Sequence, residues 1–77
     1  MDEIAEVIRF HRKKARLSRA ELSRLAGVGK TTLFDLEHGK TTVRLDGLLR
    51  TLETLNIRLD WSSPLKEEYE KGAGSRP

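Results

Sequence analysis

Residues 17–40 read LSRAELSRLAGVGKTTLFDLEHGK, and this segment carries the clearest helix signals in the chain. Ser18 and Glu21 form a capping box, in which each side chain accepts a hydrogen bond from the other residue's backbone N–H. Gly27 ends the same helix, because glycine adopts the left-handed conformation at little cost. Three apolar residues supply the inner face of this helix: Leu22, Leu25 and Ala26. The pattern therefore predicts a short helix from Ser18 to Gly27.

A second short helix follows after a tight turn. We expect Gly29 to cap its start and Gly39 to end it, while Leu33 and Leu36 face inward. Two short helices joined by a tight turn, with a polar outer face on the second, are typical of a helix-turn-helix. In such a motif the second helix enters the major groove of DNA. Residues 18–39 therefore predict a DNA-binding surface.

The segments on either side also follow a helical period. Ile4, Val7 and Ile8 recur at helical spacing and predict an amphipathic helix over residues 3–15. A stripe of leucines predicts a fourth helix: Leu45, Leu48, Leu49, Leu52 and Leu55. Gly47 lies inside this stripe, where it costs about 1 kcal/mol relative to alanine. We therefore expect another part of the chain to pack closely against that glycine.

The segment after the fourth helix has a different period. Apolar and charged residues alternate over residues 56–61, which predicts a half-buried strand. The apolar members are Ile57, Leu59 and Trp61. The sequence contains no second strand pattern, and an unpaired strand edge is a liability. The simplest solution is that the strand pairs with its copy in a second chain, so that its apolar residues form a dimer interface. The alternative is an irregular extension packed on the fourth helix.

The composition separates the chain into one small domain and a tail. With 77 residues, a single domain over residues 1–63 is the natural interpretation. Residues 64–77 are first acidic and then rich in glycine, so we expect a flexible tail. A domain this short buries only about 60% of its unfolded surface, and the chain has no cysteine for disulfide bonds. Oligomerisation is therefore the expected source of additional stability.

Several classes of protein are disfavoured. No apolar stretch approaches the length of a membrane span, and the chain does not start with a signal-peptide pattern, so we expect a cytoplasmic protein. The segment from Gly29 to Thr31 is similar to the end of a phosphate-binding loop, but that motif needs a glycine where Arg24 stands. No catalytic set or metal-ligand cluster is visible, so we predict no enzyme activity, no metal and no cofactor. Binding of single-stranded RNA is disfavoured because the chain has few aromatic residues and no sheet on which bases could stack.

Residues 17–40 resemble the XRE-type helix-turn-helix of phage repressors and Cro proteins. The spacing of six residues is its most specific feature: Leu22, Gly27-Val28, Leu33, Glu37 and Gly39. The resemblance covers about residues 4–57. It implies an all-α fold of four to five helices, to which the short C-terminal strand is added. It also implies a homodimer that represses transcription from a near-palindromic operator in double-stranded DNA, with half-sites about 34 Å apart.

The resemblance assigns base contacts to the exposed face of the recognition helix. Five residues fall on that face: Lys30, Thr31, Thr32, Phe34 and Asp35. Lysine can reach O6 and N7 of guanine, threonine can meet a base or a thymine methyl group, and aspartate can accept from N4 of cytosine. Phe34 can touch a thymine methyl group.

Phosphate contacts are implied near the two ends of the motif: Ser18, Arg19 and Lys40. Arg19 stands where the family usually has glutamine, and Gly29 replaces the usual serine or threonine cap. Three basic residues in and directly after the first helix are expected to share one face and are further phosphate candidates: Arg9, Lys13 and Arg16. The alternative for these three is a solvated helix face.

Arg12 and Glu37 match a partly buried ion pair of phage-repressor relatives. The pair would tie the first helix to the end of the third helix. Its role would be structural, because breaking one side of a buried pair costs about 3–5 kcal/mol.

The continuation of the chain, from Thr41 to Trp61, resembles the Hip-type antitoxins of bacteria. These proteins follow the helix-turn-helix with one strand that pairs across the dimer. The resemblance implies a bacterial protein that represses its own operon and binds a kinase-fold toxin. The alternatives are a module whose main role is to bind a toxin, and a stand-alone repressor with no toxin. A toxin-like reading frame beside the gene would distinguish these alternatives.

Overall fold

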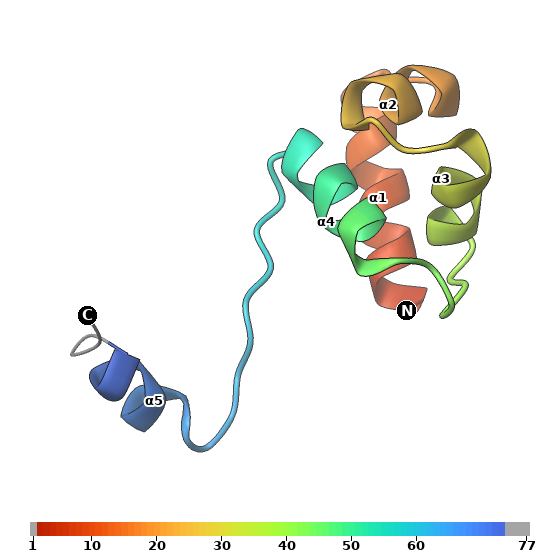
Figure 1. Ribbon diagram of the computed structural model, residues 1–77. Coiled ribbons are helices and arrows are strands. Elements are labelled where there is room, and N and C mark those ends of the chain that lie inside the picture. Colours follow the sequence, from red (N-terminus) through yellow and green to blue (C-terminus); the bar gives the residue numbers. More distant parts are fainter. Residues whose placement is uncertain (1, 74–77) are drawn as a thin grey trace.

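The computed structural model describes residues 2–73 and contains five helices within them. These are α1 (Asp2–Lys14), α2 (Arg19–Ala26), α3 (Lys30–Glu37), α4 (Leu45–Thr54) and α5 (Lys66–Ala73). Figure 1 shows α1 to α4 packed together, with α5 standing apart at the end of an extended segment. The described residues include no strand, so the predicted all-helical class is confirmed for this single chain.

Helices α1 to α4 surround one hydrophobic core. Six buried side chains form it: Ile8, Leu22, Leu33, Leu36, Leu48 and Leu52. Helix α3 packs against α1, α2 and α4, so its inner side is buried against all three. Its outer side, together with the start of α2, therefore remains available for another molecule.

The junction between α2 and α3 follows the predicted local signals. The Oγ atom of Ser18 accepts a hydrogen bond from the N–H of Glu21 at 3.0 Å, and Glu21 Oε1 accepts one from the N–H of Ser18 at 2.8 Å. These hydrogen bonds lower the pKa of Glu21. Gly27 has a φ of 69°, and the N–H of Val28 donates to the carbonyl of Ser23 at 3.0 Å. The capping box and the glycine stop are thus both confirmed.

The other three helices of the domain end in the same way. Two positions beyond the last residue of each helix, the chain has a residue with positive φ: Arg16 (58°), Gly39 (74°) and Asn56 (59°). The N–H of the next residue then donates to the carbonyl five positions earlier, as Leu17 does to Arg12 at 3.1 Å. These terminal hydrogen bonds reverse the chain within a few residues, which brings four short helices around one core.

Helices α3 and α4 approach closely at Gly47, as predicted. A Cβ atom at this position would lie 3.2 Å from the Cγ2 atom of Thr32, which is closer than an ordinary van der Waals contact. The absence of a side chain at Gly47 therefore allows α4 to pack against the first turn of α3.

The prediction that Leu25 faces inward is wrong, and two leucines of the predicted α4 stripe are exposed as well. The exposed fractions are 60% for Leu25, 65% for Leu45 and 43% for Leu49. In α2 the buried residues are Leu22, Ser23 and Ala26, so the buried face is centred on the side away from Leu25. The small hydroxyl of Ser23 is tolerated there because it donates to the carbonyl of Ala20 at 3.0 Å. The leucine stripe of α4 is wider than the part of α4 that the other helices cover, so Leu45 and Leu49 stay exposed.

The C-terminal arm, residues 57–73, leaves the domain after α4. Ile57 packs against the core, whereas Leu59 and Trp61 are 54% and 47% exposed. Strand pairing across a dimer needs a second copy of the chain and stays a prediction. Helix α5 lies within residues 64–77, for which a flexible tail and no helix was predicted. Residues 74–77 of that tail lie outside the described residues.

Local contacts join α5 to the segment before it. The rings of Trp61 and Tyr69 meet edge to face with centroids 5.3 Å apart. The Nζ atom of Lys66 lies 2.8 Å from an oxygen of Asp60. This hydrogen bond lowers the pKa of Asp60 and raises that of Lys66. None of the five helices found over residues 2–73 is long and apolar enough to span a membrane.

Candidate nucleic-acid interface

The start of α2 and the outer side of α3 share a shallow hollow of about 380 Å³. Five residues line it: Arg19, Ala20, Lys30, Thr31 and Phe34. Four of these are predicted DNA contacts, one from α2 and three from α3. We call this surface the α2–α3 face. It brings a predicted phosphate contact, Arg19, next to three predicted base contacts.

Arg19 is anchored at one side of this face. Its Nε atom donates to Glu37 Oε1 at 3.0 Å, and its guanidinium carbon lies 5.6 Å from the centre of the Phe34 ring. The side chain is 43% exposed. An arginine has five N–H donors, and Arg19 uses its Nε donor for Glu37. Its terminal amino groups are not engaged by any residue from 2 to 73, and they are suited to a phosphate.

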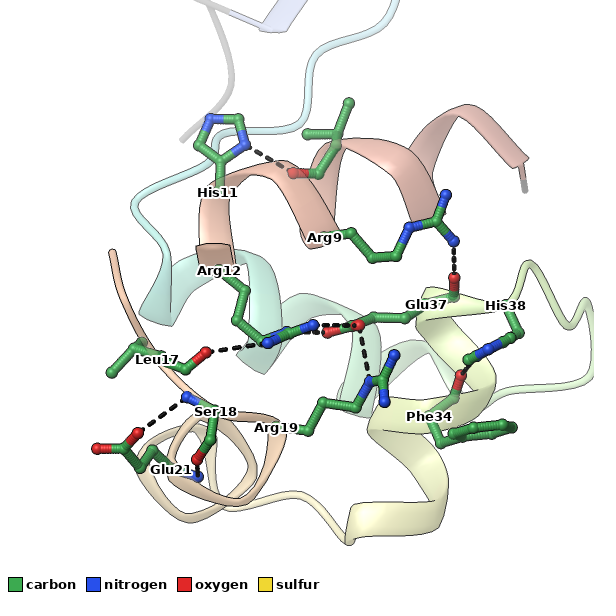
Figure 2. Close-up of polar contacts among 11 residues, drawn as sticks. Arg9, His11, Arg12, Leu17, Ser18, Arg19, Glu21, Phe34, Glu37 and His38 are labelled. Atoms are coloured by element: carbon green, nitrogen blue, oxygen red, sulfur yellow. Dashed lines mark hydrogen bonds and ion pairs between the residues drawn. The ribbon is translucent and has the colours of Figure 1, made fainter. Parts of the chain in front are cut away.

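Glu37 connects the α2–α3 face to the interior. Its side chain is fully buried and also accepts two hydrogen bonds from Arg12, at 2.6 Å from Nε and 3.0 Å from a terminal nitrogen. Figure 2 shows the guanidinium groups of Arg12 and Arg19 converging on this carboxylate. Arg12 also donates to the carbonyl of Leu17 at 2.9 Å. The network thus ties α1, the turn after it, α2 and α3 together.

The charge state of Glu37 follows from these contacts. Burial alone would raise the pKa of this carboxyl, because it removes water from the ionised form. Hydrogen bonds and charge from Arg12 and Arg19 outweigh that effect and hold the pKa below its usual value. Glu37 therefore stays ionised at neutral pH.

Phe34 lies beside a residue for which no site role was predicted. The rings of Phe34 and His38 are stacked, with centroids 3.8 Å apart and an interplanar angle of 21°. The Nδ1 atom of His38 lies 2.7 Å from the carbonyl oxygen of Phe34. Because a carbonyl oxygen only accepts, Nδ1 carries the proton and donates it. The spacing of four residues within a helix was the available sequence signal for this pair.

Comparison with known proteins agrees with this geometry. The sequence model of the helix-turn-helix family matches residues 8–62, which include all of α2, α3 and α4. The chain belongs to the XRE-type helix-turn-helix family. It is also 37% identical, over 62 residues, to an uncharacterized HTH-type transcriptional regulator, y4mF, of Sinorhizobium fredii (strain NBRC 101917 / NGR234). That match covers 80% of this chain and 82% of the relative.

In this member of the XRE-type family, the predicted base contacts lie on two sides of α3. Lys30, Thr31 and Phe34 line the α2–α3 face, whereas Thr32 and Asp35 line a second hollow of about 340 Å³ beside α4. Lys40, a predicted phosphate contact, lies in the second hollow as well, with its Nζ atom 3.5 Å from an Asp35 oxygen. The recognition helix therefore presents two distinct chemical surfaces.

The remaining predicted phosphate contacts surround these surfaces. Ser18 is exposed at the start of α2, with its hydroxyl oxygen engaged in the capping box. Arg9 donates to the backbone carbonyl of Glu37 and so lies beside the end of α3. Lys13 and Arg16 are exposed. Among the described residues no cluster of side chains is suited to hold a metal ion.

Proposed function

We propose that this XRE-type protein binds double-stranded DNA sequence-specifically as a homodimer and represses transcription. The observation that carries the proposal is the α2–α3 face, on which Arg19, Lys30, Thr31 and Phe34 meet. In protein–DNA complexes phosphate contacts set the register of the protein, and contacts to base edges read the sequence. This face offers a group for each of these tasks within one continuous surface.

The chemistry of each side chain indicates what it contacts. Lys30 is exposed in the first turn of α3 and can donate to O6 and N7 of guanine. Thr31 can meet a base edge through its hydroxyl or a thymine through its methyl group. Arg19 is held so that its terminal amino groups can bind a phosphate. Further phosphate contacts around the face come from Ser18, Arg9, Lys13 and Arg16. In the second hollow, beside α4, Thr32 and Asp35 contact bases and Lys40 contacts a phosphate.

The C-terminal arm supplies the proposed dimer contact. Leu59 and Trp61 are exposed on an extended segment, and an edge-to-edge pair of such segments would place these side chains beside those of the partner on one face. Ile57 packs against the core of its own domain and would anchor the start of the paired segment there. A two-fold dimer places two copies of α3 in successive major grooves, about 34 Å apart. The operator is therefore near-palindromic.

A gel-shift titration on the DNA upstream of the gene tests this proposal. The expected result is a retarded band that survives an excess of scrambled competitor at two salt concentrations. The double variant Lys30→Ala/Thr31→Ala should lose discrimination between the operator and scrambled DNA but keep non-specific binding. Lys71→Ala on α5 is the matched control and should bind like the wild type. Equal loss on both DNAs would count against base reading by α3.

A second candidate function is binding of a protein partner as an antitoxin. The specific observation in its favour is the arm, where Leu59, Trp61 and Leu65 are all exposed outside the four-helix domain. The Hip-type resemblance of residues 41–61 then suggests repression of the protein's own operon and a kinase-fold toxin as the partner. A gel-shift band removed entirely by competitor, together with a toxin-like reading frame beside the gene, would make partner binding the main function.

A further inference from the structure

Phe34 occupies an unusual position on the α2–α3 face. Its apolar ring is 47% exposed on a surface otherwise lined by Arg19, Ala20, Lys30 and Thr31. A single exposed apolar residue needs no explanation by itself. Phe34 differs because its ring is held by specific contacts rather than left free in solvent.

Two polar groups fix the orientation of this ring. His38 stacks on it at 3.8 Å between centroids, and the imidazole is itself held by its hydrogen bond to the Phe34 carbonyl at 2.7 Å. Arg19 lies over the ring at 5.6 Å and is anchored by Glu37, a side chain with no exposure at all. Figure 2 shows Arg19, Phe34 and His38 gathered beside Glu37 at the end of α3. A chain of fixed contacts therefore leads from the interior to the Phe34 ring.

We propose that Phe34 reads the 5-methyl group of thymine, and that His38 is the residue that positions its ring. This inference rests on the DNA-binding function proposed above. In the major groove, thymine is the base that offers an apolar group at C5, while the other base edges offer hydrogen-bond donors and acceptors. An aromatic ring has no donor or acceptor in its plane, so it favours the methyl group over a polar edge. A ring that is already ordered loses little conformational freedom when it binds.

The test replaces thymine by deoxyuracil, which removes the methyl group and leaves every hydrogen-bonding atom unchanged. The operator is first obtained by selecting binders from random duplexes, and each thymine of one half-site is then replaced in turn. We expect at least one position where the wild type binds about fourfold more weakly, the effect of one buried methyl group. In Phe34→Ala the thymine-to-uracil ratio at that position should fall to about one, within the accuracy of the titration.

Thr31 is the competing source of a methyl contact, because its own side chain ends in a methyl group beside Phe34 on the same face. Thr31→Ser removes that methyl group and keeps the hydroxyl. If the ratio persists in Phe34→Ala and disappears in Thr31→Ser, threonine reads the base and the proposal is wrong. If the ratio persists in Thr31→Ser and disappears in Phe34→Ala, the proposal holds.

The positioning role of His38 needs its own pair of variants. His38→Ala removes the stacked ring and should reduce the thymine-to-uracil ratio, whereas His38→Tyr retains an aromatic ring and should preserve most of it. An unchanged ratio in His38→Ala would overturn the role of His38. Phe34 and His38 are both exposed, so circular dichroism should show that their variants fold like the wild type.

Failure of this inference is distinguishable from failure of the proposed function. If no sequence is enriched from the random duplexes, sequence-specific DNA binding itself is wrong. If an operator is enriched but no thymine position shows a methyl effect, the protein reads DNA without the contribution of Phe34 proposed here.

Discussion

Replacing Glu37 with glutamine removes a fully buried negative charge and leaves Arg12, whose side chain is only 10% exposed, without its partner. Removing one side of a buried ion pair costs about 3–5 kcal/mol. Glutamine keeps the size of the side chain and one oxygen that can accept a hydrogen bond, so we expect the lower end, about 3 kcal/mol. In a domain of this size that loss lowers the melting temperature by about 12–24 °C.

Urea unfolding followed by far-UV circular dichroism measures this loss. Arg19→Gln is the control, because Arg19 is 43% exposed and a pair with an exposed partner contributes about 1 kcal/mol or less. The double variant Arg12→Met/Glu37→Leu replaces the buried pair by apolar side chains and should recover most of the lost stability. A free energy of unfolding for Glu37→Gln within about 1 kcal/mol of the wild type would refute the reasoning.

Three further predictions concern the acid sensitivity of the domain, its phosphate contacts and its dimer interface. Although burial opposes ionisation, Arg12 and Arg19 hold the pKa of Glu37 below its usual 4.5. The ionised Glu37 therefore stabilises the folded state fully above pH 4.5. This stabilisation is lost as the pH falls through the lower pKa of the folded state. The urea midpoint of the wild type should drop in this acidic range and that of Glu37→Gln should drop less, and parallel curves would contradict the assignment. Arg19→Ala should weaken binding to all DNA sequences and reduce the salt slope by about 0.9 for each protomer, and an unchanged slope would remove Arg19 from the phosphate contacts. Leu59→Glu should give monomers in sedimentation velocity, and a persistent dimer would disprove the strand interface.

Local signals in the sequence were sufficient to predict the helices of the domain. A capping box acts through hydrogen bonds between residues three positions apart, so Ser18 and Glu21 needed no knowledge of the rest of the chain. The stop at Gly27 depends on one backbone conformation. Gly47 was informative for a different reason, since a glycine that weakens a helix is retained where a neighbour packs closely.

Features that depend on neighbouring elements were harder to predict. The period of α4 places Leu45 and Leu49 near its inner side, but their burial depends on how much of α4 the other helices cover. The prediction for Leu25 failed for the same reason, because the buried face of α2 includes the polar Ser23 in place of Leu25. Helix α5 was missed because its charged residues show no apolar face for a core. Nearly all of its described residues are exposed, consistent with a helix outside the core.

The site shows the same division between local and distant information. The family resemblance implied that Lys30, Thr31 and Phe34 lie on the outer side of α3, and they do lie together. The helical period alone did not reveal that Thr32 and Asp35 face α4, because that depends on the position of α4. The stack of His38 on Phe34 depends on side-chain rotamers, which a spacing of four residues permits but does not determine.

Arg19 explains how this chain accommodates its departure from the family pattern. Glutamine, usual at this position, carries no charge, whereas arginine at the edge of the domain gains an ion pair with Glu37 at 3.0 Å. Because the contact uses Nε, the terminal amino groups remain available to bind a phosphate, and the guanidinium lies beside Phe34. The same buried carboxylate therefore stabilises the domain through Arg12 and orients a proposed DNA contact through Arg19. It follows that Glu37→Gln should weaken DNA binding even under conditions where the variant is fully folded.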